Sequence, residues 1–369
     1  LIIRDKTRGR RSLDDLMRAL WIRYGKTGIG IPGDMARMAG VAQPDLVIVT
    51  MVGIEHYSYF RSREAVAAEK GVLVESLRPA GVALLNGDDP AVMAMATRTR
   101  ARIITFGTGR DCHYRISDVR ASFPERMRMT ISCARGEFEI STRFTGKHFS
   151  VPTAAAFAAA VELGLDPKTA ATGISSFDPP INRCSVVEIP NGPIFILDAL
   201  KAPSETISLS FEVIASARSA RKTIIFGQLS DYSGNGKRVY RDAINEALNI
   251  TDRVFFVAKE HHRSILEKMS KGRVVDDALA AFEALKEEVE PGEIILLKGS
   301  SSLHLERIVL AFQEEVKCRL SSCKIQSSCM ECGLYKIPQS KHQSVLWRKK
   351  LLRLRDRIFK GSLWENRDA

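Results

Sequence analysis

Short apolar runs rich in Val and Ile recur along this chain, and the first two end in clusters of polar residues. Residues 45–50 read Asp-Leu-Val-Ile-Val-Thr and lead into a loop that carries His56, while residues 82–85 read Val-Ala-Leu-Leu and lead into Asn-Gly-Asp-Asp. Continuous apolar runs of this length are typical of parallel strands that are buried on both faces. Open α/β sheets bind ligands beyond the carboxyl ends of their strands. The pattern therefore predicts an α/β fold with an enzyme-like site at one edge of a sheet.

The alternation of strands and helices continues to residue 297. Strands are expected at residues 102–107, 194–198, 223–227, 253–258 and 293–297, and helices at residues 153–163, 239–248 and 277–289. Residues 114–142 read as a β-rich segment, because Met127, Met129 and Ile131 occupy alternate positions. Strands separated by helices predict a Rossmann-like C-terminal domain with right-handed crossovers. This domain lacks a Gly-x-Gly-x-x-Gly turn, so we do not expect a nicotinamide site in it.

Composition narrows the class of protein further. A chain of 369 residues exceeds what one hydrophobic core usually supports, so more than one domain is expected. The sequence shows no apolar stretch of about 18 residues and no signal peptide, which predicts a cytoplasmic protein. Seven cysteines, an odd number, argue against a secreted disulfide framework. The formal charge of +12 is concentrated in residues 317–369, where 13 Lys and Arg face 4 Asp and Glu, so the basic character belongs to the tail.

An ordered set of residues follows the first two expected strands. The set consists of Thr50, His56, Phe60, Ser62, Lys70, Asn86, Asp88 and Asp89. Its order and spacing resemble the pattern of the Mur ligase family, ATP-dependent enzymes that add amino acids or dipeptides to the peptidoglycan precursor. The resemblance extends over roughly residues 32–311. It implies a central α/β domain in which helices cover a parallel sheet.

Three motifs further along the chain support the resemblance. A Gly-Lys-His segment at residues 146–148, a proline-stiffened hinge at residues 178–183 and a Lys-Gly-Ser turn at residues 298–300 follow the family's order. Proline restricts the backbone, so the hinge is a natural domain boundary. We therefore expect an N-terminally incomplete central domain over residues 1–182, a C-terminal Rossmann-like domain over residues 183–316 and a Cys-rich basic tail over residues 317–369.

The resemblance also implies an activity and the residues that perform it. Mur ligases use ATP to convert a carboxylate into an acyl phosphate, and an amine then attacks this group to form an amide, with ADP and phosphate as products. Because phosphate and carboxylate repel each other, such a site needs metal ions and fixed positive groups. The expected partners are ATP, Mg²⁺ and a UDP-muramyl-peptide-like substrate.

Site residues are carried over from the family by position. His56 and a carbamylated Lys70 would be catalytic and would hold Mg²⁺. Nucleotide binding is expected of Asn86, Asp88, Arg183 and Asp198, and substrate binding of Lys201, Lys298 and Ser300. A planar guanidinium suits phosphate, and a helix start with a nearby lysine suits an anionic group. The alternative interpretation of His56, Lys70 and Arg183 is that they are solvated surface side chains.

Several positions depart from the family pattern. The Gly-Lys-Thr at residues 25–27 follows no apolar strand and lacks the upstream glycine, so it is not a phosphate loop. Lys26 stands where the family has a magnesium-binding glutamate, and a cation would repel the metal. Phe149 and Pro152 replace two amides, the first of which reads the adenine, and Lys201 alters the acceptor loop. We expect the 369-residue chain by itself to be inactive, and the alternative is a non-catalytic binding or regulatory protein on the same fold.

The tail carries its own pattern. Cys318, Cys323, Cys329 and Cys332 have the spacing C-x4-C-x5-C-x2-C, which suits tetrahedral zinc, with unpaired thiols or an iron–sulfur cluster as alternatives. Residues 346–359 interleave Leu, Trp and Ile with Lys and Arg. Such a segment fits a membrane surface or RNA, and it also fits a solvated or partner-docking helix. A third hypothesis for the chain is therefore a zinc-containing nucleic-acid or membrane adaptor.

Overall fold

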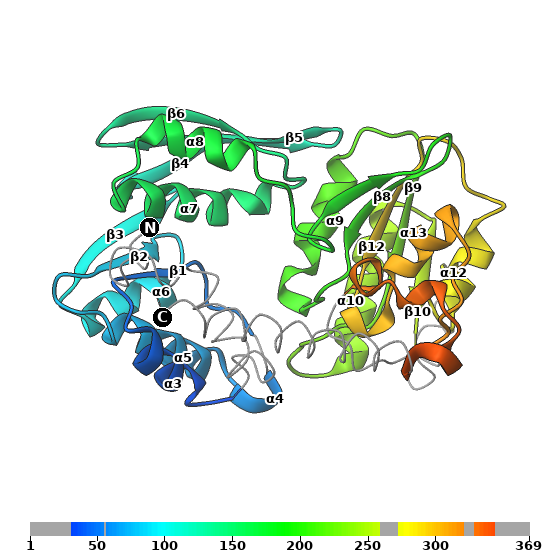
Figure 1. Cartoon of the computed structure of the whole chain (residues 1–369), viewed down its shortest axis with the longest axis horizontal. Coiled ribbons are helices and arrows are strands. Elements are labelled where there is room, and N and C mark those ends of the chain that lie inside the picture. Colours follow the sequence, from blue (N-terminus) through cyan, green and yellow to red (C-terminus); the bar gives the residue numbers. More distant parts are fainter. Residues whose placement is uncertain (1–30, 55–56, 259–271, 321–327, 344–369) are drawn as a thin grey trace, which may run out of the picture. The chain divides into compact units, whose positions relative to one another are not determined.

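The computed structural model describes residues 31–54, 57–258, 272–320 and 328–343. The chain divides into two compact units, and each is described separately below (Figure 1). Unit 1 comprises Leu1–Ser117, Thr130–Phe138 and Val151–Ala171, and unit 2 comprises Asp118–Met129, Glu139–Ser150 and Thr172–Ala369. Among the described residues, no helix combines the length and the apolar character needed to cross a bilayer. The domain boundaries at residues 182 and 316 stay predictions.

Unit 1 contains three parallel strands, β1 (Leu46–Val49), β2 (Val82–Asn86) and β3 (Arg102–Gly107). β2 lies between the other two, so all three carboxyl ends meet at one edge. The crossover from β1 to β2 is α5 (Arg63–Glu75), which begins where the Ser62 side chain accepts a hydrogen bond from Ala65 N at 3.1 Å. Val66 and Val74 of α5 pack against the apolar side chains of β1 and β2, which buries this face of the sheet.

The first sheet continues through β4 (Tyr114–Ser122), β5 (Glu125–Cys133) and β6 (Gly136–Ser141). Met127, Met129 and Ile131 are at most 1% exposed, which confirms the alternation predicted for this segment. The other α-helices that the structure describes in this part of the chain are α3 (Asp34–Ala42), α4 (Tyr57–Phe60), α6 (Pro90–Met93), α7 (Ser150–Glu162) and α8 (Pro167–Ser175).

Unit 2 contains a second six-stranded sheet, with the order β11-β10-β9-β12-β8-β7. The strands are β7 (Ser185–Glu188), β8 (Ile194–Asp198), β9 (Lys222–Phe226), β10 (Val254–Val257), β11 (Arg273–Val275) and β12 (Ile294–Lys298). All neighbouring pairs are parallel except β7 with β8. The predicted mixed α/β fold with two mainly parallel sheets is confirmed.

Side chains of the second sheet alternate between two helix-covered faces. The covering helices are α9 (Ile207–Ser216), α10 (Gly236–Ile250), α12 (Ala278–Leu285) and α13 (Glu306–Gln313). Ile196 and Leu296 pack with α9 and α10, whereas Phe195 and Leu297 pack with α12 and α13. Figure 1 shows α9 and α12 on opposite sides of the sheet. Burial on both faces explains why β8, β10 and β12 are almost continuously apolar.

The amino-terminal edge of this sheet is held by a buried carboxylate. Glu293, directly before β12, is 1% exposed and receives Arg221 at 3.1 Å and Arg253 at 3.3 Å. The Thr223 hydroxyl donates to the same carboxylate. Arg221 and Thr223 lie at the start of β9, and Arg253 directly precedes β10. The network therefore holds together the starts of β9, β10 and β12.

Within unit 2, part of the tail packs against α12 and α13. The short helix α14 (Cys329–Cys332) begins at a capping box between Ser328 and Glu331. Leu310 of α13 and Leu279 of α12 bury apolar surface together with Cys318, Cys329 and Tyr335 of the tail. The tail residues that the structure describes are therefore part of the folded unit.

Most expected elements agree with the structure to within a few residues. The helix expected at residues 239–248 begins at Gly236 and ends at Ile250, and the one expected at residues 277–289 ends at Leu285. Segments such as α3, α9 and β7 were not assigned from the sequence. The candidate phosphate-loop region and residues 346–359 lie outside the described residues.

Candidate functional site

A buried ion pair lies at the carboxyl ends of the neighbouring strands β8 and β12. The Lys298 ammonium is 2.7 Å from the Asp198 carboxylate, and the two side chains are 4% and 9% exposed. The Ser210 hydroxyl of α9 donates to the same carboxylate, and Lys298 donates a second hydrogen bond to Lys201 O at 3.0 Å. A buried charge pair is tolerated when further hydrogen bonds satisfy both groups, as they do here. The pair is a fixed polar site at the edge where α/β sheets bind ligands.

Two neighbouring loops hold the Lys-Gly-Ser turn beside this pair. The backbone N–H of Ser300 donates to Gln228 O at 3.2 Å, and that of Ser301 donates to Leu200 O at 3.2 Å. The turn after β12 is therefore fixed to the loops after β9 and β8. The structure brings together the predicted residues Asp198, Lys201, Lys298 and Ser300.

His148 and Cys184 adjoin the ion pair. Nε2 of His148 lies 3.9 Å from Sγ of Cys184, and Cys184 is fully buried. Burial lowers the pKa of His148, against the opposing effect of the Asp198 carboxylate. Burial raises the pKa of the Cys184 thiol, and the Asp198 carboxylate acts in the same direction. Both groups are therefore neutral at pH 7, and Arg183 adds positive charge to the cluster.

The segment that contains His148 is packed by aromatic rings. The Phe149 ring stacks on Phe144 with centroids 4.8 Å apart and also contacts the His148 ring at 4.3 Å. Gly146 has φ +119°, and a Cβ there would lie 2.7 Å from Cε1 of His148, so the position requires glycine. Phe149 therefore contributes apolar packing where an amide would offer hydrogen bonds to a base.

In unit 1, Asn86 and Asp88 hold together the loops that follow β1, β2 and β3. Asn86 donates to Thr50 O at 2.8 Å and accepts from Asp88 N at 3.0 Å. The Asp88 carboxylate accepts the backbone N–H groups of Thr108 at 2.7 Å and Gly109 at 3.1 Å. Both predicted residues thus lie at the carboxyl edge of the first sheet, and their nucleotide-binding roles stay predictions.

The predicted magnesium ligands are Lys70 and His56. Lys70 of α5 donates from Nζ to Met51 O at 3.0 Å, so its ammonium lies beside the loop after β1. His56 lies outside the described residues. Mg²⁺ is usually held by one or two carboxylates together with phosphate and water oxygens, so a site of this kind needs few ligands from the protein itself. The magnesium-binding roles of His56 and Lys70 stay predictions.

The four tail cysteines predicted to bind zinc do not all fall in the described residues, since Cys323 lies outside them. Cys318 and Cys329 are both buried, and both accept hydrogen bonds from the Arg307 guanidinium. Arg307 Nε donates to Cys329 Sγ at 3.3 Å, and Arg307 Nη2 donates to Cys318 Sγ at 3.6 Å. Burial, followed by the Glu306 carboxylate, raises the pKa of the Cys329 thiol to about 12. The four-cysteine zinc site stays a prediction.

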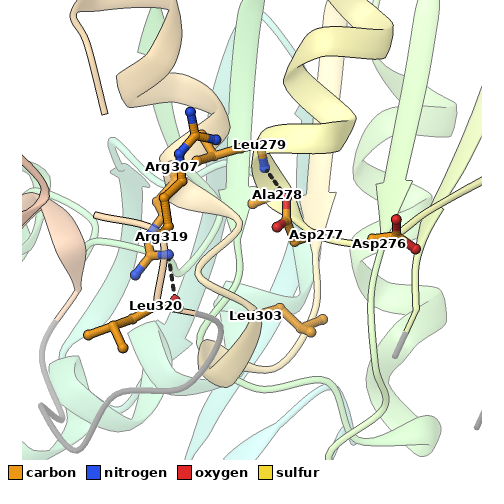
Figure 2. A pocket seen from close by; sticks show the side chains of 8 residues that line it. All are labelled: Asp276, Asp277, Ala278, Leu279, Leu303, Arg307, Arg319 and Leu320. Atoms are coloured by element: carbon orange, nitrogen blue, oxygen red, sulfur yellow. Dashed lines mark hydrogen bonds between the residues drawn. The ribbon is translucent and has the colours of Figure 1, made fainter. Parts of the chain in front are cut away.

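Figure 2 shows a small cavity next to Arg307. Its lining also includes Asp277 and Leu279 at the start of α12, and Arg319 and Leu320 of the tail. Its volume of about 50 Å³ is far below the roughly 300–1,000 Å³ of typical ligand pockets. The cavity therefore does not accommodate a nucleotide or a peptide.

Family profiles match both parts of the chain. The profile described as "Mur ligase middle domain" matches residues 30–160, and that described as "Mur ligase, glutamate ligase domain" matches residues 182–301. Together the two matches cover more than half of the chain. The chain belongs to the Mur ligase family. The predicted resemblance is confirmed.

Curated relatives agree with this assignment. A UDP-N-acetylmuramoyl-tripeptide--D-alanyl-D-alanine ligase of Bacillus subtilis is 27% identical over 295 residues, covering 76% of this chain and 62% of the relative. The ligase of the same name from Mycobacterium tuberculosis is 25% identical over 78% of this chain and 61% of its own length. The chain thus spans about three fifths of the length of these relatives.

Solved structures share the fold. MurF from Acinetobacter baumannii superposes with a TM-score of 0.68 at 17% identity, over 78% of this chain and 64% of that protein. MurF ligase from Thermotoga maritima, solved in complex with ADP, gives a TM-score of 0.66 at 21% identity, over 77% of this chain and 65% of that protein. At such identities the likeness shows the Mur ligase fold alone.

The sequence alone does not indicate that Ser210, Cys184 and His148 belong to the cluster around Asp198. Ser210 lies on α9, a helix that the sequence did not assign, and a single Ser gives no signal without that helix. His148 belongs to the Gly-Lys-His segment, but its place beside Cys184 depends on a contact between residues 36 positions apart.

Proposed function

We propose that the chain forms part of an ATP-dependent, ADP-forming amide ligase of peptidoglycan synthesis. The substrate would be the carboxylate of a UDP-muramyl-peptide-like molecule, and the acceptor an amine such as a D-alanyl dipeptide. Membership of the Mur ligase family and the names of the curated relatives support this reaction class. The observation that carries the proposal is the buried Asp198–Lys298 pair at the carboxyl edge of β8 and β12. A cytoplasmic location, where ATP is available, is part of the proposal.

The reaction consists of two displacements. A carboxylate oxygen attacks the γ-phosphorus and releases ADP, and the amine nitrogen then attacks the acyl carbon and releases phosphate with loss of a proton. Fixed positive groups assist both steps because they stabilise charge without reorganising. Lys298 is held by Asp198 and the Lys201 carbonyl, so its ammonium is fixed in place beside the Ser300 turn. Arg183 would add a guanidinium suited to phosphate oxygens.

A second candidate function is binding without catalysis on the same fold. Phe149 favours it, because the ring is stacked on Phe144 and cannot read an adenine as an amide would. The sequence also contains no Gly-x-Gly-Lys-Thr phosphate loop. We propose accordingly that the 369-residue chain by itself does not turn over ATP.

A chimera separates the two functions. The amino-terminal part of the Bacillus subtilis relative, outside the matched region, is fused before residue 32, and ADP and amide formation are measured with UDP-muramyl-tripeptide, D-alanyl-D-alanine, ATP and Mg²⁺. Under the ligase proposal the chimera is active, and Lys298→Met loses activity under conditions in which circular dichroism shows the variant folded. Arg143→Met, which removes an exposed ion pair, leaves activity unchanged. A folded but inactive chimera would favour binding alone. Acyl-phosphate formation by the 369-residue chain would refute its proposed inactivity.

A further inference from the structure

Three side chains of types that can bind metals meet in unit 2, and none of them belongs to the Asp198 cluster. His304 and Glu306 come from the turn and helix start after β12, and Cys329 comes from α14 of the tail. They are 5%, 2% and 3% exposed. One potential ligand atom from each side chain lies within 4.8 Å of the other two. A nitrogen, an oxygen and a sulfur donor therefore converge in a buried space.

The cluster has contacts that fix its geometry and one group that lacks a partner. Glu306 Oε1 accepts a hydrogen bond from the backbone N–H of Cys329 at 2.8 Å. The Nδ1 atom of His304 lies 3.6 Å from this oxygen and 3.4 Å from Cys329 Sγ. The other carboxylate oxygen, Glu306 Oε2, is buried and has no hydrogen-bond partner among the described residues. Buried carboxylate oxygens nearly always have a partner, and leaving one unsatisfied is costly. A cation bound at this cluster would satisfy the carboxylate.

We propose that His304, Glu306 and Cys329 bind a divalent transition-metal ion, with Zn²⁺ as the expected occupant. Mixed imidazole, carboxylate and thiolate donors suit zinc, whereas magnesium and calcium take oxygen ligands. The carboxylate and the thiolate together balance the charge of a divalent ion. A water molecule would complete a four-coordinate shell.

Arg307 is compatible with this site as a positioning residue. Its Nε–H donates to Cys329 Sγ at 3.3 Å, and hydrogen bonds to ligand atoms commonly orient them around a metal. Its Nη2 donates to Cys318 Sγ at 3.6 Å, so Cys318 contacts another part of the same guanidinium. The proposed site therefore contains a single sulfur ligand, unlike the four-cysteine site suggested by the tail spacing.

The site would fasten the tail to the C-terminal sheet. The three ligands bring α14 of the tail against the start of α13, which follows the Lys-Gly-Ser turn. This proposal goes beyond the ligase function and does not depend on it.

The test measures zinc retained by the 369-residue chain. The protein is equilibrated with Zn²⁺, free metal is removed by gel filtration, and bound metal is counted by mass spectrometry. We expect one zinc per chain in the wild type and in Cys332→Ser, and at least tenfold weaker binding in Cys329→Ser and Glu306→Gln. Cys332 is the matched control because it lies in the same short helix and belongs to the four-cysteine alternative.

X-ray absorption of the zinc-loaded wild type gives a second readout that needs no variant to fold. We expect one sulfur at about 2.3 Å and nitrogen or oxygen ligands at about 2.0–2.2 Å. A shell of four sulfurs, or zinc binding that is lost in Cys332→Ser, would assign the metal to the tail cysteines and overturn the proposal. Wild-type protein that retains no zinc, or unchanged binding by folded Cys329→Ser, would also overturn it.

Discussion

Replacing Lys298 with Met tests whether the buried ion pair is a fixed part of the fold. The substitution leaves the Asp198 carboxylate buried beside the Ser210 hydroxyl without its ammonium partner. At 2.7 Å and an effective dielectric constant of about 20, the gross Coulomb attraction is about 6 kcal/mol. Desolvation offsets part of this attraction, so we expect the single substitution to destabilise unit 2 by about 3–5 kcal/mol. Asp198→Asn combined with Lys298→Met should cost much less than the sum of the two single changes, because it removes both charges.

Amide hydrogen exchange of peptides that cover β8 and β12 reports this loss locally. A cost of about 3 kcal/mol or more corresponds to exchange accelerated by roughly a hundredfold or more. Arg143→Met is the matched control, since it breaks a pair with Asp178 at the same 2.7 Å distance whose side chains are 54% and 75% exposed. We expect that control to change stability by less than about 1 kcal/mol. Additive single and double variants, within about 0.5 kcal/mol, would refute the coupling.

Three further predictions concern single residues. Asp277→Ala removes the carboxylate that caps α12 by accepting hydrogen bonds from the backbone N–H groups of Leu279 and Ala280. We expect urea unfolding to show a loss of stability of about 1 kcal/mol. An equal loss in Asp277→Asn, which keeps an accepting oxygen, would contradict the capping role. Cys184 should react with iodoacetamide at pH 8 at least tenfold more slowly than the half-buried Cys133, because burial raises the pKa of the Cys184 thiol. Peptide mapping that finds equal rates would disprove this. Burial raises the pKa of Tyr240 to about 12 in the folded protein, compared with about 10 in the unfolded chain. The stabilisation that comes from burying the neutral phenol is therefore complete below about pH 10 and falls between pH 10 and 12. Urea unfolding over that range should show a smaller decline in Tyr240→Phe, and an unchanged decline would exclude Tyr240 as its source.

Strands such as β3, β8 and β12 are predictable from the sequence because each is a short, mostly apolar run, whereas the partly exposed β7 and β11 are not. β8 and β3 have the expected bounds, and their carboxyl ends lie where the polar motifs pointed. The family resemblance implied nucleotide binding for Asp198 and substrate binding for Lys201, Lys298 and Ser300, and hydrogen bonds connect the loops that carry these residues. Sequence order along parallel strands was enough to bring these four residues together.

Partners that come from helix faces were less predictable. Ser210 reaches Asp198 because α9 crosses the sheet, and no local sequence feature gives that crossing. The tail cysteines suggested a four-sulfur site, whereas packing of α14 places Cys329 beside His304 and Glu306, more than twenty residues earlier in the chain. Contacts of this kind depend on how elements pack, which spacing within one segment does not report.

The Glu293 network has a consequence for how this domain can diverge. It fixes the starts of β9, β10 and β12, at the opposite end of the sheet from Asp198 and Lys298. Loops after the strands can therefore change length and sequence without moving the sheet that supports them. The loop at residues 199–203, which follows β8 at the Asp198 end of the sheet, is in a position where such changes leave the opposite edge intact.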